Sequence, residues 1–169
     1  HTSYFTSADL NFLNSRDWLE NLGFDYIEGP DNSYYSALPR GVFADPGDKA
    51  LYQRYLNWLD QDLTKGRMFS VIQTVTTHPP FVIPGSEKRG EEAAFQYADE
   101  ALGGFVRALE DRGFFDAGVL VITGDHRSMT LLTAEEREVL GPSAPARVPA
   151  VIVGKSFEGR GRIGGQGQQ

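Results

Sequence analysis

The sequence predicts a layered α/β fold in which helices pack against a largely parallel sheet. Amphipathic helical patterns alternate along the chain with short apolar runs, which is typical of this class. Two of these runs, residues 68–76 and 118–123, are rich in β-branched side chains, as buried strands are. The 169 residues have ordinary apolar and charged contents, which indicates one folded core and excludes a fibre, a coiled coil or a disordered chain.

Charge and cysteine content exclude further classes. The net charge of −7 opposes binding to nucleic-acid phosphates and gives no reason for adhesion to anionic lipid. The chain has no cysteine, so it has neither disulfides nor thiolate metal ligands. No segment is apolar for long enough to span a bilayer, and the beginning at His1 has no features of a signal peptide. We therefore expect His1 to follow a cut inside a longer chain.

The first helix is expected to begin after Asn14, which can cap it, and to end at Gly23. Leu13 and Trp18 are spaced for a hydrophobic contact across the beginning of this helix. Residues 24–28 alternate between apolar and polar side chains, which predicts a short strand.

The second helix is expected after a loop rich in Gly, Pro, Asn and Ser. Asp45 can cap it, Pro46 suits its first position, and Gly66 ends it. Apolar residues recur at every fourth position, and they are Leu51, Tyr55, Leu59 and Leu63. The strand over residues 68–76 follows, and the prolines after His78 end it, since proline cannot donate to a sheet.

The third helix is predicted over residues 91–112 and is closed by Gly113. Residues 118–123 form an apolar run, which predicts a strand buried on both faces, and residues 148–153 form a further strand. In a parallel sheet, reactive loops lie at the carboxyl ends of the strands.

Two of the three histidines follow strands directly. His78 follows residues 68–76, and the pair Asp125 and His126 follows residues 118–123 across Gly124. If these strands are parallel, both loops lie at the same edge of the sheet.

Asp125 and His126 are the candidate metal ligands. A carboxylate beside an imidazole can bind a divalent cation, and the O and N ligands suit Zn²⁺ or Mn²⁺ better than Ca²⁺. Two ligands do not complete a site, so others must come from elsewhere. Taken alone, the dipeptide also fits a simple turn in which Asp125 caps and His126 is solvated.

His78 is the candidate catalytic residue. The two following prolines restrict its backbone, and a held imidazole can donate to a phosphate or sulfate oxygen or protonate a leaving group. A histidine packed under a proline-rich turn is the structural alternative. Arg127 can hold an anionic oxygen with two hydrogen bonds, or it can be an ordinary surface arginine.

Four motifs together resemble a known family. They are Thr76-Thr77-His78-Pro79-Pro80-Phe81, Tyr97-Ala98-Asp99-Glu100-Ala101-Leu102-Gly103, the strand ending in Gly124-Asp125-His126, and Arg147-Val148-Pro149. Their order and spacing are similar to the sulfatase-like branch of the alkaline phosphatase superfamily. The resemblance is closest to lipoteichoic acid synthases and phosphoglycerol transferases of bacterial envelopes, and it covers nearly the whole chain.

The resemblance implies an incomplete α/β/α fold of the alkaline phosphatase type. Residues 1–169 would be the C-terminal portion of one catalytic domain. Independently of the resemblance, the Gly-rich low-complexity composition of residues 159–169 predicts a mobile tail. Asp125 and His126 would bind the metal and His78 would be catalytic. The family's nucleophilic Thr or Ser and a further acidic ligand would lie upstream of this chain, so the isolated chain is expected to be inactive.

The substrate-binding residues depart from the resemblance. The glycerol-phosphate branch places a His and an Arg near the first helix to hold phosphate, whereas the stretch from Thr6 to Arg16 contains no His. Arg16 is one step from the expected position. Arg16 and Arg127 are therefore the candidate substrate-binding residues, and glycerol phosphate as the transferred group is in doubt.

The expected function is that of a metal-dependent hydrolase or transferase acting on phosphate or sulfate esters. Its cofactor would be a divalent ion, Mn²⁺, Zn²⁺ or Mg²⁺, with Ca²⁺ also allowed. Its partner would be an anionic ester linked to lipid or glycan, not nucleic acid, and the parent protein would be membrane-anchored through segments outside this chain. The site of action would be the outer face of the bacterial cytoplasmic membrane or the periplasm. The alternative is a non-catalytic sulfatase-like domain that binds envelope polymer or a partner protein.

Overall fold

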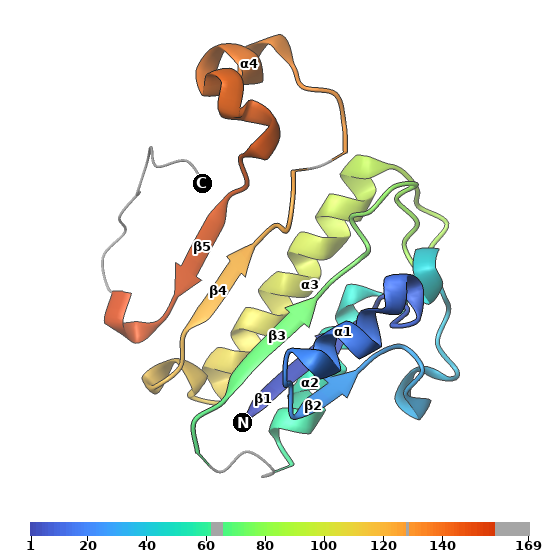
Figure 1. The fold of residues 1–169 in the computed structure, drawn as a ribbon, viewed down its shortest axis with the longest axis vertical. Coiled ribbons are helices and arrows are strands. Elements are labelled where there is room, and N and C mark those ends of the chain that lie inside the picture. The colour runs from blue at the N-terminus through green and yellow to red at the C-terminus, as the bar shows by residue number, and fades with distance from the viewer. Residues whose placement is uncertain (62–65, 128, 158–169) are drawn as a thin grey trace. The chain divides into compact units, whose positions relative to one another are not determined.

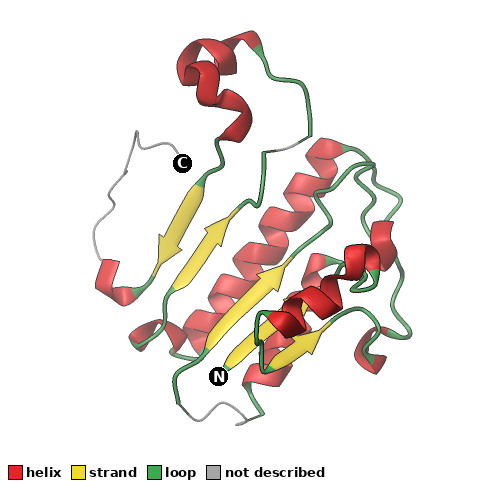
Figure 2. Ribbon diagram, in the orientation of Figure 1, coloured by secondary structure: helices red, strands yellow, loops and turns green. Residues whose placement is uncertain are grey.

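The computed structural model describes residues 1–61, 66–127 and 129–157. The chain divides into two compact units, His1–Ala108 and Leu109–Gln169. Figure 1 shows the elements of each unit, and Figure 2 shows how helices, strands and loops alternate along the chain. None of the helices within the described ranges is both long enough and apolar enough to cross a membrane.

The first unit is built on a parallel three-stranded sheet with the order β2-β1-β3. Its elements are β1 (Thr2–Thr6), α1 (Ser15–Asn21), β2 (Tyr26–Glu28), α2 (Asp48–Leu59), β3 (Phe69–Gln73) and most of α3 (Glu91–Asp111). In the register of this sheet, Tyr4 lies opposite both Ile27 and Val71. The parallel sheet with flanking helices confirms the predicted α/β class.

The central strand β1 sends alternate side chains to opposite faces of the sheet. Phe5 is fully buried. Its ring centroid lies 5.2 Å from the ring centroids of Tyr55 and Trp58, both of which belong to α2. Tyr4 and Thr6 line a pocket together with residues of α1, so α1 covers the other face. Figure 1 shows the two helices on opposite sides of the sheet. Both faces of this sheet are therefore covered.

The sequence did not predict β1. Thr2–Thr6 contains hydroxyl-bearing residues and two aromatic residues but no continuous apolar run. Its neighbours in the parallel sheet nevertheless bury Ser3 and Phe5 completely. Pairing with strands far along the chain, rather than a local pattern, makes this segment the central strand.

The boundaries of α1 are close to the prediction, but its predicted first-turn contact is wrong. Asn14 occupies the cap position in a left-handed conformation, φ 54° and ψ 35°, and its side chain makes no capping hydrogen bond. Leu13 is also left-handed and is 82% exposed, while Trp18 is 60% exposed. Because two left-handed residues turn the chain before the helix, Leu13 projects into solvent instead of packing on Trp18. Gly23, at φ 82°, ends the helix as predicted.

Helix α2 begins at Asp48, two residues later than expected, and ends at Leu59, before the predicted end at Gly66. The Asp45 carboxylate accepts a hydrogen bond from the Gly47 backbone N–H at 2.7 Å, so it stabilises the turn that precedes the helix. The predicted apolar position Leu63 lies outside the described residues. Helix α3 agrees with its predicted bounds to within one residue.

The second unit contains β4 (Leu120–Thr123), α4 (Ala134–Leu140) and β5 (Ala150–Val153). β4 and β5 form an antiparallel pair, whereas β1, β2 and β3 pair in parallel. The expectation that β4 is buried on both faces is wrong, because its residue Val121 is 58% exposed. The predicted tail, residues 159–169, lies outside the described residues.

Candidate functional site

The carboxyl ends of β1 and β3 form one edge of the parallel sheet. Thr6 lies opposite Gln73 at the last paired position, so the loops that follow both strands leave the sheet at the same edge. This is where open α/β sheets bind ligands. The loop after β3 carries His78, the predicted catalytic residue.

His78 is half-buried and held by its own loop. Its Nδ1 lies 2.6 Å from the Pro79 carbonyl oxygen, and its backbone N–H donates to the Val75 carbonyl at 2.8 Å. The Phe43 ring lies edge-on to the imidazole, with 5.0 Å between centroids. Because a carbonyl can only accept, Nδ1 carries the proton in the neutral ring and Nε2 keeps its lone pair. The imidazole is therefore oriented with Nε2 available for an external group.

Two buried carboxylates anchor the strand end that leads to His78. Asp45 and Asp48 are each 1% exposed and Thr76 is 2% exposed. The Thr76 hydroxyl lies 2.8 Å from Asp48 Oδ1 and 3.1 Å from Asp45 Oδ2. Asp48 Oδ1 also accepts the Val75 and Thr76 backbone N–H groups at 3.4 and 3.3 Å. The beginning of α2 is thereby tied to the backbone two residues before His78.

Burial raises the pKa of Asp45 to about 6; the Gly47 N–H opposes the shift, and the negative charge of Asp48 adds to it. Burial also raises the pKa of Asp48, and its hydrogen bonds from Thr76 oppose that shift. A hydroxyl has one proton, so Thr76 donates to Asp48 and can accept from Asp45 when Asp45 is protonated. In the sequence, Asp45 is marked only as a helix cap, and no pattern singles out the catalytic-loop contacts of Asp48 or Thr76.

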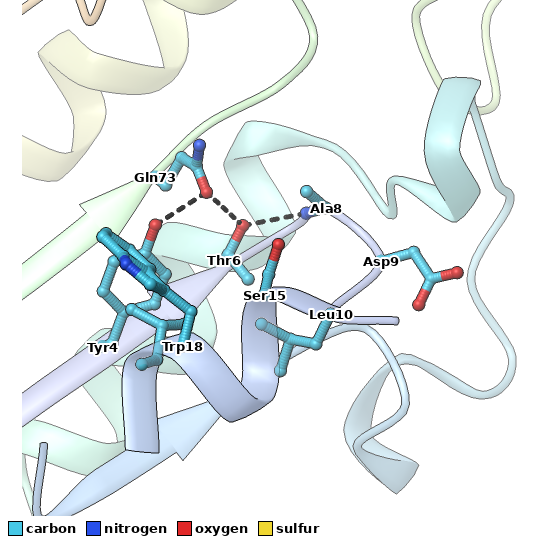
Figure 3. Close-up of a pocket in the computed structure, with 9 residues that line it drawn as sticks. Tyr4, Thr6, Ala8, Asp9, Leu10, Ser15, Trp18 and Gln73 are labelled. Atoms are coloured by element: carbon cyan, nitrogen blue, oxygen red, sulfur yellow. Dashed lines mark hydrogen bonds between the residues drawn. The ribbon is translucent and has the colours of Figure 1, made fainter. Parts of the chain in front are cut away.

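A pocket of about 130 Å³ opens at the same edge of the sheet (Figure 3). Its lining includes polar or aromatic side chains from β1, the following turn, α1 and β3, namely Tyr4, Thr6, Asp9, Ser15, Trp18 and Gln73. The Tyr4 and Thr6 hydroxyls donate to the Gln73 side-chain oxygen at 2.8 and 3.2 Å. No sequence motif marks these residues as a site, although Thr6, Asp9 and Ser15 lie in the stretch from Thr6 to Arg16 that corresponds to the family's substrate-binding position.

In the second unit, Asp125 and His126 follow β4 as predicted. Their side chains are 75% and 56% exposed, and Asp125 Oδ1 lies 3.7 Å from His126 Nε2. His126 Nδ1 lies 2.6 Å from the Arg127 carbonyl oxygen, so this nitrogen carries the proton and Nε2 keeps its lone pair. A Cβ at Gly124 would lie 3.0 Å from the His126 carbonyl oxygen, which explains the glycine before the pair.

The pair suits one part of a metal site. Two ligands that are each about 2.1 Å from a tetrahedral ion lie roughly 3.4 Å apart, close to the observed separation. A backbone carbonyl that fixes the imidazole through Nδ1 is the usual arrangement behind a metal-binding Nε2. Among the described residues, no cluster of three or more His, Cys, Asp or Glu side chains could hold an ion. Asp125 and His126 would therefore need further ligands.

The two candidate arginines each have an acidic partner in their own unit. Arg127 donates twice to the Glu136 carboxylate, at 2.7 and 2.9 Å, and also to the Thr130 carbonyl at 2.7 Å. Arg16 pairs with Asp31 at 2.8 Å and is not among the residues lining the pocket. Their substrate-binding roles remain predictions. That His78 lies at the same sheet edge as Asp125 and His126 also remains a prediction, because His78 belongs to the first unit and the pair belongs to the second.

Comparisons with known proteins identify the family. Residues 1–158 match the family model described as Sulfatase. A protein of the alkaline phosphatase superfamily from Vibrio parahaemolyticus aligns over 92% of this chain and 38% of its own, with 22% identity and a TM-score of 0.73. The lipoteichoic acid synthase LtaP from Listeria monocytogenes aligns over 94% of this chain and 44% of its own, with 24% identity and a TM-score of 0.74.

The comparison with curated proteins gives no match. The chain spans less than half the length of each of these two solved structures, which share its fold. With the family model covering nearly all of it, the chain belongs to the sulfatase family.

Proposed function

We propose that this chain is part of a metal-dependent enzyme that hydrolyses or transfers phosphate or sulfate esters at the bacterial envelope. The observation that carries the proposal is the Asp125–His126 pair at the end of β4, with a carboxylate oxygen and an imidazole lone pair 3.7 Å apart. Membership of the sulfatase family supports it. So does the fold shared with a lipoteichoic acid synthase.

Asp125 Oδ1 and His126 Nε2 would hold the cation, Mn²⁺, Zn²⁺ or Mg²⁺, together with ligands from outside the chain. When bound, such an ion supplies Lewis-acid stabilisation of charge on the ester oxygens. His78 Nε2, once protonated, would donate to an oxygen of the transferred group or to the leaving oxygen. The attacking hydroxyl would come from a Thr or Ser outside this chain.

The substrate would be an anionic ester attached to a lipid or a glycan. The enzyme would act on the outer face of the bacterial cytoplasmic membrane or in the periplasm. Segments outside this chain would supply its membrane anchor.

Metal binding tests the proposal without requiring turnover. A longer parent chain that includes the upstream ligands should bind Mn²⁺, followed by electron paramagnetic resonance, and Zn²⁺, followed by calorimetry. The double variant Asp125→Ala/His126→Ala should lose at least about tenfold in affinity, since both donors are removed. Glu135→Ala/Glu138→Ala, which removes two exposed carboxylates from α4, is the matched control and should keep the affinity of the parent chain. Equal affinity in the parent chain and the ligand double variant would contradict the ligand assignment, as would failure of both to bind.

Turnover tests the rest of the proposal. The chain of residues 1–169 should not hydrolyse p-nitrophenyl phosphate or p-nitrophenyl sulfate, because the nucleophile is proposed to lie elsewhere. A longer protein that includes the upstream Thr or Ser should do so, and His78→Ala should slow it. A longer protein that binds metal but turns over neither ester would favour the alternative, a non-catalytic sulfatase-like domain that binds envelope polymer or a partner protein.

A further inference from the structure

We propose that residues 43–48 form a clamp that positions His78, in which Phe43 holds the imidazole and Asp48 holds the backbone. Both residues act through His78, so they are positioning residues, and His78 remains the catalytic candidate. The effect of the clamp on turnover rests on the proposed function. The positioning itself rests on contacts within the first unit.

Phe43 holds the imidazole from outside the His78 loop. Its ring is nearly perpendicular to the imidazole, at 84°, with 5.0 Å between the ring centroids. The Phe12 ring lies 5.6 Å from the Phe43 ring, so the phenylalanine is supported by a second aromatic residue. His78 Nδ1 lies 2.6 Å from the Pro79 carbonyl oxygen. A rotation of the imidazole would therefore break that hydrogen bond and disturb the contact with Phe43.

The backbone of the clamp is strained where it carries Phe43. Phe43 and Ala44 have φ values of 55° and 61°, in the left-handed region that residues other than glycine rarely adopt. Such conformations persist where surrounding contacts hold them, and they cluster at functional sites. Here the Gly41 N–H donates to the Asp45 carbonyl at 2.7 Å and closes the turn across both strained residues. This turn places the Phe43 ring against His78.

Asp48, at the other end of the clamp, holds the backbone before His78. Its Oδ1 accepts the Val75 N–H at 3.4 Å, the Thr76 N–H at 3.3 Å and the Thr76 hydroxyl at 2.8 Å. The Val75 carbonyl in turn accepts the His78 N–H at 2.8 Å. Asp48 and His78 are therefore connected through the two polar groups of one residue, Val75.

Helix α3 fixes the clamp from another side. Gly47 has a φ of 94°, and a Cβ at this position would lie 2.7 Å from the Tyr97 hydroxyl oxygen. That hydroxyl accepts the Lys49 backbone N–H at 3.3 Å, and the Lys49 ammonium lies 5.0 Å from the centroid of the Tyr97 ring. The close approach requires glycine at position 47. Tyr97, which belongs to one of the four sequence motifs, thereby gains a role in holding the clamp.

The position of His78 decides which nitrogen faces the ester. With Nδ1 bound to the Pro79 carbonyl, Nε2 is the nitrogen left to exchange a proton with an external group. Proton transfer requires this nitrogen to lie within hydrogen-bonding distance of the reacting oxygen. An imidazole that rotates would present either nitrogen at a variable distance. Loss of the clamp should therefore lower kcat more than it weakens substrate binding.

Imidazole ¹⁵N NMR on the chain of residues 1–169 tests the role of Phe43 without turnover. At a pH where the ring is neutral, the shifts of His78 should show a proton on Nδ1. Phe43→Ala should move both nitrogen shifts toward the average of the two tautomers, and Phe43→Tyr, which keeps an aromatic ring, should restore them. Phe95→Ala removes a comparably exposed phenylalanine from α3 and is the matched control. Unchanged His78 shifts in Phe43→Ala would overturn its positioning role.

Amide exchange tests the role of Asp48. Asp48→Ala removes the acceptor, so exchange at the His78 N–H should become about tenfold faster relative to Ala101, a buried residue of α3. Asp48→Asn keeps an oxygen at this position and should remain close to the parent chain. If Asp48→Ala does not fold, Thr76→Val, which removes the hydroxyl bound to Asp48, gives the same comparison. Exchange at His78 that changes only in proportion to Ala101 would show general destabilisation and overturn the assignment.

Kinetics of a longer, active protein test the consequence for turnover. Phe43→Ala should lower kcat by about tenfold or more and change KM by less than about twofold, while Phe95→Ala should leave both unchanged. An unchanged kcat in Phe43→Ala would overturn the catalytic part of the inference. Failure of the proposed function appears as a longer protein without turnover, whereas failure of the clamp appears as unchanged His78 shifts in the variant. The two failures are therefore distinguishable.

Discussion

The two histidines with proposed roles are held in different ways. His78 is half-buried, and the backbone just before it is fixed by buried Thr76, Asp45 and Asp48 from another part of the chain. His126 is 56% exposed, and within the described part of the chain its hydrogen bonds reach the neighbouring residues Asp125 and Arg127. The first histidine is thus positioned by the fold of its unit. The second is positioned by a local turn, as suits a ligand that completes its site with groups from elsewhere.

The two sheets also differ in how deeply their side chains are buried. Helices cover both faces of the β1–β3 sheet, and Phe5 at its centre is fully buried. In the β4–β5 pair, Val121 and Ile152, which lie opposite each other, are 58% and 47% exposed. Substitutions should therefore be costly in the first unit and mild in the second.

Phe5→Ala should have the largest effect. Deleting a buried aromatic ring leaves a cavity between β1 and α2, so the free energy of unfolding should fall by about 3–5 kcal/mol. Val121→Ala at the centre of β4 should cost less than about 1 kcal/mol, because the side chain is already largely exposed. Urea denaturation followed by circular dichroism measures both. Similar losses for the two variants would break the comparison between the sheets.

Thr76→Val should have the next largest effect. The substitution keeps the shape of the side chain but removes the hydroxyl between two buried carboxylates, which should cost about 1–3 kcal/mol. Amide exchange should also become faster at Val75 and His78. The matched control is Thr123→Val, which removes an exposed hydroxyl at the end of β4 and should cost less than about 1 kcal/mol. If the exchange at His78 were unchanged, the cluster would not position that loop.

The pH dependence of stability should reveal Asp45. Its pKa in the folded state, about 6, is above the usual carboxyl value of 3.8, so the folded state binds the proton more tightly. The stabilisation from this group is therefore fully present below the unfolded pKa and is lost as the pH rises through 6. From pH 7 to pH 5, the chain should gain about 1 kcal/mol relative to Asp45→Asn, since one pKa unit corresponds to about 1.36 kcal/mol. If Asp45→Asn had the same pH dependence of stability as the parent chain, the ionisation would belong to another group. Asp17→Asn, at an exposed site on α1, is the control and should keep the pH dependence of the parent chain.

The sequence predicted the parts of the fold that have local patterns. The apolar stripe of α3 and the glycines at positions 23 and 113 gave correct helix ends, because periodicity and left-handed backbone are properties of short segments. It did not predict β1, whose burial depends on two partner strands distant in sequence. The apolar run of β4 led to the wrong prediction that both of its faces are buried, since such a run does not reveal which neighbours cover it.

The same limit applies to the candidate site. His78, Asp125 and His126 stand out because they follow strands in motifs with a recognisable spacing. Asp48, Thr76 and Gln73 belong to no such motif, and their importance appears only when the fold brings them into hydrogen-bonding distance of other side chains. The Asp-Pro-Gly-Asp sequence at 45–48 was the one available signal, and it fits an ordinary helix beginning equally well.

Arg127→Gln should have the smallest effect on stability and separates two roles of this residue. The ion pair with Glu136 is partly exposed to solvent, and helix α4 keeps its capping box between Thr133 and Glu136 without it. The urea midpoint should therefore move less than in any variant above, and Mn²⁺ affinity should match that of the parent chain. In a longer, active protein, the same change should raise KM for the anionic ester if Arg127 exchanges Glu136 for substrate. An unchanged KM together with a large loss of stability would make Arg127 a structural residue that holds the loop after the metal pair.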